Sequence, residues 1–121
     1  MQISKVNIQG VEIALVDSSE VLIKDGQSAL DILMTVSYES GCNRIVLDKS
    51  VICEDFFNLR TGIAGEVLQK VVNYQLKVAI VGDFSMYTSK SLADFIYESN
   101  QGRHVFFVST TEEAIEKLSG S

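Results

Sequence analysis

The sequence predicts an α/β domain with a mixed, mostly parallel sheet of five strands flanked by helices. Two alternating apolar runs surround Gln9-Gly10, and short apolar runs then alternate with stretches of helical spacing. The run "KVAIV" is apolar without alternation, which is typical of a strand buried on both faces. The predicted order is β-β-α-β-α-β-α-β-α, and alternation of this kind favours a layered fold with parallel strands.

The opening pair of strands is expected to form a hairpin at Gln9-Gly10. Glycine readily adopts the positive φ that a tight two-residue turn needs. Val11, Ile13 and Leu15 alternate along the second strand and therefore share one of its faces. This hairpin makes one pair of strands antiparallel, so the predicted sheet is mixed.

The remaining elements are predicted from apolar spacing. Later strands are expected at 44–48, 77–83 and 104–108, and helices at 28–41, 62–74, 89–102 and 111–118. Ser28 is expected to cap the first turn of one helix, with Asp31 completing a capping-box pattern, and Ser91 and Asp94 fit the same pattern in another. Ser89 and Ser91 are both expected to be caps. Gly41 is expected to end the first helix in the left-handed conformation.

Composition excludes several classes of protein. A chain of 121 residues is most simply one domain spanning 1–121, and the sequence shows no linker. The formal net charge of −6 argues against nucleic acid as a ligand. No apolar run is long enough to span a membrane, and the N-terminus does not read as a secretory leader, so we expect a cytoplasmic protein. One histidine and two cysteines make a four-ligand zinc site improbable.

A functional site is expected where the parallel strands end, because ligands of open α/β sheets collect beyond the carboxyl ends of the strands. We expect three loops, which follow residues 47, 81 and 108, to open on this edge. The third loop carries Ser109, Thr110 and Thr111. The candidate binding or switch residues lie in the first two loops: Asp48, Ser50, Arg60, Thr61, Gly62, Asp83, Ser85 and Tyr87.

Thr61-Gly62 has two interpretations. The first is structural: Thr61 caps the following helix, and Gly62 and Gly65 permit an uncrowded entrance and close packing. The second is a switch, since a phosphate on Thr61 would place about −1.5 to −2 charge at the positive end of a helix dipole. Arg60 could pair with that phosphate. On these residues alone the structural interpretation is favoured.

The element order and several motifs resemble the STAS domain, named for sulphate transporters and anti-sigma factor antagonists. "DKS", Asp48 to Ser50, is similar to the turn that ends a strand in that family. "RTGIAGEVLQ" resembles the helix entrance whose hydroxyl residue is phosphorylated in regulatory members, which places Thr61 at that position. The sequence departs from the family in having Leu59 and Arg60, and no acidic residue, before Thr61.

Longer pieces resemble a small bacterial family catalogued as domain of unknown function 4180. These pieces are "EDFFNLRTGIAGEVLQKVVNY", "KVAIVGDFSMYTSKSLADFIYESNQG" and "VFFV". The resemblance implies a bacterial cytoplasmic protein and supplies no activity. Together the two resemblances imply a STAS-like regulatory module that binds a protein partner at the edge holding Thr61, Asp83 and Tyr87.

Two other classes of function stay open. An enzyme could use Asp48 and Asp83 for acid–base or metal chemistry, with Ser50, Ser85 or Thr61 as a nucleophile. His104 is expected at the far end of the sheet, which argues against a Ser-His-Asp site. A small-molecule or nucleotide site is the other alternative, although no phosphate-binding glycine motif is present. The leading hypothesis requires no cofactor, metal or catalytic residue.

The aromatic residues also have two interpretations. They are Phe56, Phe57, Phe84, Tyr87, Phe95 and Tyr97. If exposed together, they would form a sticky patch suited to a partner or to a second copy of the chain. Core packing is the favoured interpretation. The sequence does not decide whether the chain forms a homodimer.

Overall fold

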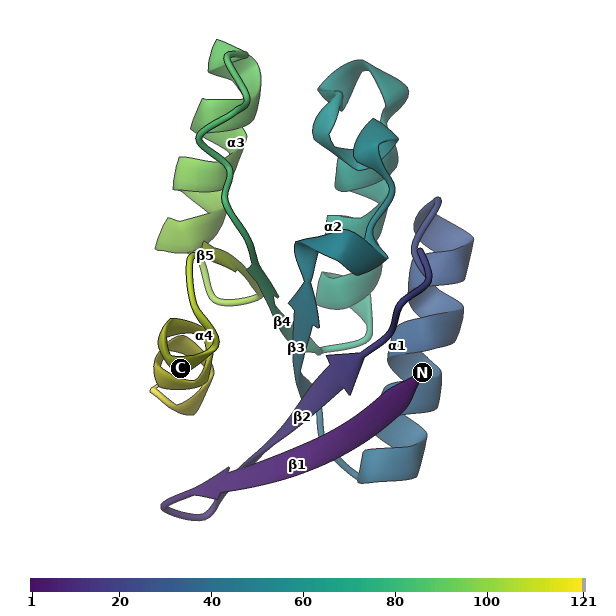
Figure 1. The fold of residues 1–121 in the computed structure, drawn as a ribbon, viewed down its shortest axis with the longest axis vertical. Coiled ribbons are helices and arrows are strands. Elements are labelled where there is room, and N and C mark those ends of the chain that lie inside the picture. Colours follow the sequence, from purple (N-terminus) through teal and green to yellow (C-terminus); the bar gives the residue numbers. More distant parts are fainter. Residues whose placement is uncertain (121) are drawn as a thin grey trace.

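A five-stranded sheet with the order β1-β2-β3-β4-β5 forms the centre of the computed structural model, which describes residues 1–120 (Figure 1). β1 pairs antiparallel with β2, and every other neighbouring pair is parallel. The predicted α/β class and element order are therefore confirmed. The strands are β1 Gln2–Ile8, β2 Val11–Asp17, β3 Arg44–Asp48, β4 Lys77–Val81 and β5 Val105–Val108.

Helices cover the two faces of the sheet unequally. The side chains of α1, α2 and α3 join the larger hydrophobic core on one face, whereas α4 packs against a smaller cluster on the other. Figure 1 shows α4 set apart from the other three helices. The helices are α1 Gly26–Ser40, α2 Ile63–Asn73, α3 Lys90–Gln101 and α4 Thr111–Ser119. None of these described helices is both long and apolar enough to cross a bilayer.

Short 3-10 helices fill the chain between β3 and α2, where the sequence predicted only a loop. They are η1 Lys49–Val51, η2 Glu54–Phe57 and η3 Leu59–Thr61. η2 buries Phe56 and Phe57 in the larger core. The core interpretation of these two aromatic residues is therefore correct, whereas Tyr97 is 66% exposed. The buried pair anchors the connection to the sheet.

Two predicted helix caps, Ser28 and Ser91, are wrong by a few residues, whereas the predicted cap at Ser89 is confirmed. α1 is capped by Asp25, whose Oδ1 accepts a hydrogen bond from Ser28 N at 2.8 Å, while Ser28 Oγ accepts one from Asp25 N at 3.0 Å. Ser28 is thus the third residue of the helix and not its cap. α3 is capped by Ser89, which accepts from Leu92 N at 3.2 Å, and Ser91 lies inside the helix. In both places an earlier residue takes the extended backbone conformation that a cap needs.

The predicted turn conformations are confirmed. Gln9 and Gly10 have φ values of 53° and 88°, as a two-residue hairpin turn requires. Gly41 ends α1 with a φ of 73°, and its N–H donates to Ser37 O. These positions fix the directions in which β2 and β3 leave the turn and the helix.

Candidate functional site

The carboxyl ends of β3 and β4 lie side by side, with Asp48 opposite Val81 in the parallel register. The segments that follow them enclose an open groove of about 440 Å³, which we call the strand-end groove. Most of the lining comes from residues after β3 and after β4, and the segment after β2 contributes Val21. The lining residues are Val21, Asp48, Lys49, Ser50, Ile52, Cys53, Glu54, Gly82, Asp83 and Met86.

Lys49 lines the groove and contacts residues from both of its sides. Its side chain is only 17% exposed, and its Nζ lies 3.2 Å from Glu54 Oε1. The ammonium lies 5.4 Å from the ring centroid of Phe57 and 5.1 Å from that of Tyr87, within reach of cation–π attraction. Gly82 permits this path, because a Cβ at that position would come within 2.7 Å of Lys49 Cβ.

Tyr87 connects the loop after β4 to the residues that follow β3. Its hydroxyl donates a hydrogen bond of 2.9 Å to Glu54 Oε2. Its ring stacks on Phe57 at 5.0 Å between centroids, with an interplanar angle of 17°. Because Phe57 is buried, the loop after β4 is held against η2 by packing and by a charge-assisted hydrogen bond.

The three titratable groups stabilise one another in defined charge states. The Tyr87 side chain and the Glu54 carboxylate raise the pKa of Lys49, although partial burial opposes the shift. Hydrogen bonds from Tyr87 and Lys49 lower the pKa of Glu54. Burial is the main cause of the raised pKa of Tyr87. At neutral pH Lys49 is therefore a fixed cation, and its amine is not a nucleophile.

Asp48 and Asp83 shape the turns that form the groove. Asp48 Oδ2 accepts a hydrogen bond from Ser50 N at 2.9 Å and caps η1. Asp83 Oδ1 accepts from both Ser85 N at 2.9 Å and Ser85 Oγ at 2.6 Å, and these bonds lower the pKa of Asp83. Both carboxylates thus act as local turn acceptors. In the described part of the chain, no group of three His, Cys, Asp or Glu side chains is placed to hold a metal ion.

Thr61 lies outside the lining of the groove and is not the cap of α2. Gly62 is the cap, with a φ of 79°, and it provides no side-chain hydrogen bond. The Thr61 hydroxyl lies 2.8 Å from Asp55 O and 2.9 Å from Asn58 O, and it accepts a longer bond of 3.3 Å from Ile63 N. Thr61 therefore closes the η2–η3 turn. The role predicted for Gly65 is wrong, because no atom lies within 4 Å of a Cβ there.

The structure divides the predicted site residues into two groups. Asp48, Ser50 and Asp83 line the groove, and Tyr87 and Ser85 are bonded to residues that line it. Arg60, Thr61 and Gly62 belong to the η3 turn and do not line the groove.

Two further expectations concern residues away from the groove. The residues of the third predicted loop do not join the groove. Thr110 caps α4, and Thr111 lines a separate hollow on the α4 face. His104 lies before β5, at the opposite end of the sheet, as predicted.

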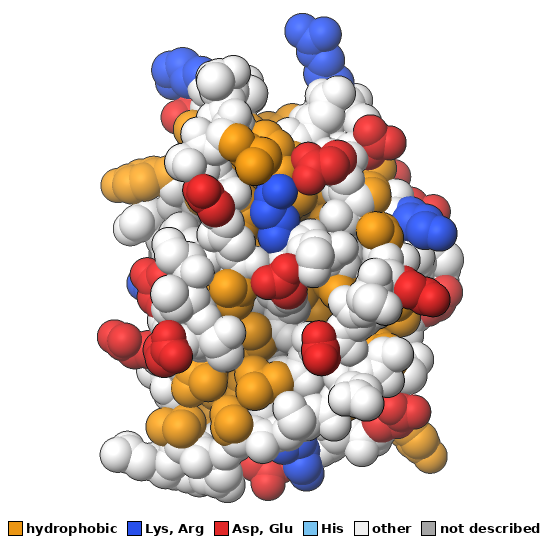
Figure 2. Space-filling view, viewed as in Figure 1, with side chains coloured by type: hydrophobic (Ala, Val, Ile, Leu, Met, Phe, Trp, Pro, Cys, Tyr) orange, Lys and Arg blue, Asp and Glu red, His pale blue; other side chains and the backbone are white. Residues whose placement is uncertain are grey.

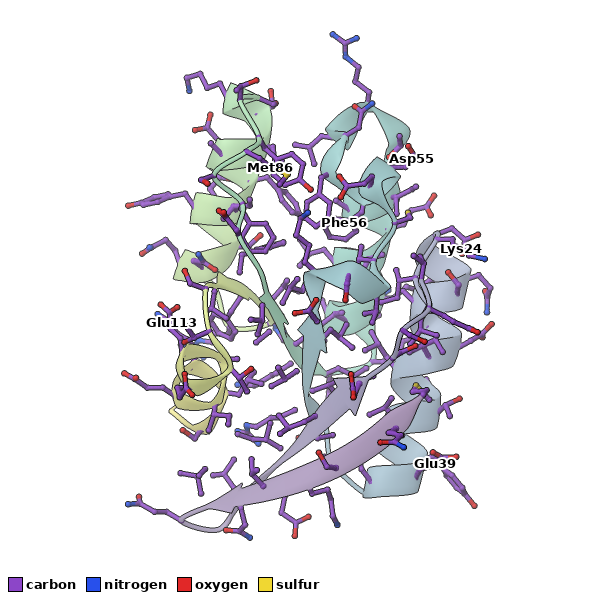
Figure 3. All side chains as sticks on the ribbon, in the orientation of Figure 1. Lys24, Glu39, Asp55, Phe56, Met86 and Glu113 are labelled. Carbon is purple, nitrogen blue, oxygen red and sulfur yellow. The ribbon has the colours of Figure 1, made fainter. Side chains whose placement is uncertain are left out.

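Sequence reasoning missed the residues that organise the groove. Lys49, Glu54 and Met86 are not among the predicted site residues, although Lys49 lies within the "DKS" motif. Figure 2 shows this face of the molecule, with a basic side chain between acidic side chains and a hydrophobic patch. In Figure 3 Met86 and Phe56 lie beyond the ends of the strands, on adjoining segments. The exposure of Met86, at 64%, depends on the tertiary structure and is not visible in the sequence.

Comparisons with known proteins give one family and one solved structure. The family model described as "Domain of unknown function (DUF4180)" matches residues 8–118. No curated protein shows significant similarity to the chain. The chain is similar to the crystal structure of a Thermotoga maritima protein provisionally described as an anti-sigma factor antagonist, with 15% identity and a TM-score of 0.49. That alignment covers 97% of this chain and 94% of the other.

Proposed function

We propose that this chain, which belongs to the family described as domain of unknown function DUF4180, is a non-catalytic, STAS-like regulatory module of the bacterial cytoplasm. It binds a partner protein at the strand-end groove. The observation that carries this proposal is the combination of exposed apolar side chains with fixed charges in one groove. Met86 is 64% exposed and Val21 is 42% exposed, and both line the groove beside Lys49 and Glu54.

Several features of the groove favour binding of a protein segment. Exposed methionine is enriched at protein interfaces, where it contacts partners of varied shape. The Lys49, Glu54 and Tyr87 side chains are already held by one another. Because they need little further ordering, docking costs less conformational entropy than it would on a mobile surface.

The same chemistry argues against catalysis by these groups. Lys49 stays protonated, which removes the amine nucleophile. Asp48 and Asp83 use their carboxylate oxygens to hold turns, and the Ser85 hydroxyl donates a hydrogen bond to Asp83. Both aspartates therefore act as turn formers.

We extend the proposal to a switch at Thr61. A kinase would transfer the γ-phosphoryl group of a nucleoside triphosphate to Oγ1, and the hydroxyl proton would pass to the kinase. The ester can no longer donate to Asp55 O or Asn58 O, which lie 2.8 and 2.9 Å away. The added charge of about −1.5 to −2 is favourable at the start of α2. η2, which carries Glu54 and Phe57, would lose the hydrogen bond from the Thr61 hydroxyl to Asp55 O. Glu54 would then change its position in the groove.

The experiment is capture of partners from the native cytoplasm with tagged protein, read by quantitative mass spectrometry. Met86→Asp places a charge in the groove, and Tyr38→Asp changes a 91% exposed residue on α1 as a matched control. We expect a protein recovered with the wild type and with Tyr38→Asp to fall by about tenfold or more with Met86→Asp, a loss typical of an interface hot spot. Equal recovery with all three chains would refute docking at the groove.

The switch is tested in the same samples. Phosphate on Thr61 should be detected in the native protein, and Thr61→Glu should change recovery of the partner relative to Thr61→Ser. A Thr61→Glu chain that is folded and binds every partner like the wild type would exclude a switch at this residue.

A small-molecule or nucleotide site, or an enzyme using Asp48 and Asp83, is the second candidate function. The volume of the groove favours it, because about 440 Å³ lies within the usual range of ligand pockets, roughly 300–1,000 Å³. Native mass spectrometry of the purified protein distinguishes the two functions. A bound small molecule that is displaced by Met86→Asp would support the second function over protein docking.

A further inference from the structure

The two edge strands of the sheet, β5 and β1, differ in whether their outward backbone groups have hydrogen-bond partners. At β5, the Asn100 side chain of α3 makes the backbone hydrogen bonds that a neighbouring strand would otherwise make. Phe107 N donates to Asn100 Oδ1 at 2.7 Å, and Asn100 Nδ2 donates to Phe107 O at 3.2 Å. The free donor and acceptor of Phe107 are thus satisfied within the chain, and α3 packs along this strand. These contacts block the pairing of a further strand with β5 at Phe107.

The β1 edge is open. In a two-residue hairpin the residues flanking the turn, here Ile8 and Val11, exchange both backbone hydrogen bonds. Alternation then directs the backbone N–H and C=O groups of Ile3, Lys5 and Asn7 away from β2. Within residues 1–120, no hydrogen bond from another segment reaches these backbone groups. An open edge of this length is a template for pairing with another strand.

The surroundings of β1 suit an added strand. On the α1 side, a hollow of about 440 Å³ runs beside the strand, and it is lined by Met1, Ile3, Ser4, Lys5, Glu39 and Ser40. On the α4 side, Val6 packs at the margin of the smaller core, and Ile8 is exposed. Side chains of an incoming strand would fill the hollow on one face and cover apolar surface on the other.

We propose that a second copy of this chain pairs with β1, antiparallel and about a two-fold axis, to form one continuous sheet. The blocked β5 edge explains why a second copy fits: a chain with one open edge pairs once and cannot extend into a fibre. With the axis near Lys5, Ile3 of one copy faces Asn7 of the other. The outward backbone groups of both strands then meet in register.

Carboxylates near the axis accommodate this register, although it places two lysines opposite one another. Lys5 Nζ donates to Ser40 O at 3.1 Å and lies 3.6 Å from Glu12 Oε2. Across the axis, Lys5 of the second copy would enter the hollow that Glu39 lines. The two lysines are therefore accompanied by the Glu12 and Glu39 carboxylates of both copies, which offsets the repulsion between like charges placed opposite one another.

Sedimentation equilibrium of the full chain tests the proposal. We expect a mass twice the 13.3 kDa of one chain. Lys5→Pro removes an outward N–H and leaves the β1–β2 hydrogen bonds intact, since proline is tolerated where the N–H faces solvent. This variant should be a monomer, while Lys5→Ser, which keeps the N–H, should remain a dimer.

Circular dichroism confirms that Lys5→Pro is folded. If it is not, Glu39→Lys provides the second test, because it puts a positive charge beside the incoming Lys5. It should raise the Kd for dimerisation by about tenfold, which corresponds to about 1.4 kcal/mol. A wild-type chain that is monomeric up to roughly 100 µM, where even a weak dimer with a micromolar Kd would form, overturns the proposal. So does a dimer that persists in the folded Lys5→Pro variant, or one that Glu39→Lys leaves unchanged.

Discussion

The strand-end groove and the Thr61 turn were predicted as one site, yet the structure builds them in different ways. The groove is held by side chains from two loops, since Tyr87 bonds to Glu54 across 33 positions of sequence. The turn is held within one loop, by a threonine hydroxyl that reaches backbone carbonyls three and six residues earlier. The groove therefore depends on core packing, whereas the turn depends on local backbone conformation. The predictions below separate these two dependences.

The largest effect is expected from Phe57→Ala. Phe57 is buried and stacks on Tyr87, so truncation leaves a cavity under the groove. We expect the free energy of unfolding to fall by about 3–5 kcal/mol, measured by chemical denaturation. Tyr97→Ala, at a residue that is 66% exposed, should change it by less than about 0.5 kcal/mol. Similar losses for the two variants would show that Phe57 does not support the groove.

Gly82→Ala should have the next largest effect. The new Cβ would lie 2.7 Å from Lys49 Cβ, so Lys49 or the loop must move, and we expect a loss of about 1–3 kcal/mol. Gly65→Ala is the matched control in α2, where no atom lies within 4 Å of the new Cβ. It should stabilise the protein by about 0.5–1 kcal/mol through helix propensity. Thermal unfolding of both variants shows whether Gly82→Ala lowers the stability and Gly65→Ala raises it. A stabilising Gly82→Ala would contradict the packing described for Lys49.

Thr61→Val tests the turn alone. Valine keeps the shape of threonine and removes the hydroxyl that reaches Asp55 O and Asn58 O. We expect a loss of about 0.5–1.5 kcal/mol in the free energy of unfolding, the usual contribution of one hydrogen bond. Thr61→Ser retains the hydroxyl and should lie closer to the wild type. If valine and serine behave alike, the hydroxyl does not hold the turn.

Tyr87→Phe is expected to give the smallest effect, and one that depends on pH. Without the Tyr87 hydroxyl, the pKa of Glu54 should rise toward its usual value, which a carboxyl NMR titration measures. Because the folded pKa of Glu54 is lowered, the stability from this contact is present above the unfolded pKa and lost as pH falls through the folded one. The stability difference between wild type and variant should therefore shrink at acid pH. An unchanged Glu54 titration would contradict the network.

Local sequence signals predicted the strands, helices and turns of the molecule well. The glycine turn at Gln9-Gly10, the left-handed Gly41 and the alternating apolar runs depend on neighbouring residues, and the structure confirms them. Caps were harder to predict, because "KDGQSALD" offers several acceptors in a row. The choice of Asp25 over Ser28 is decided by which residue takes the extended conformation before α1.

The site could be predicted only in part, because its key contacts join distant residues. The loop position of Asp48, Ser50 and Asp83 followed from the fold, since strand ends of a parallel sheet meet at one edge. The role of Lys49 could not be predicted in this way, because it depends on the absence of a side chain at Gly82 and on the Phe57 and Tyr87 rings. The cap assigned to Thr61 failed because Gly62 adopts a positive φ and starts α2 one residue later.

Amide hydrogen exchange of the chain with its captured partner tests the central claim most directly. If the partner docks at the strand-end groove, protection should appear in residues 48–57 and 82–87, the two segments that Tyr87 and Glu54 join. The same segments should stay unprotected when Met86→Asp is mixed with the partner. Protection confined to other parts of the chain, with these two segments unchanged, would contradict the proposed docking site.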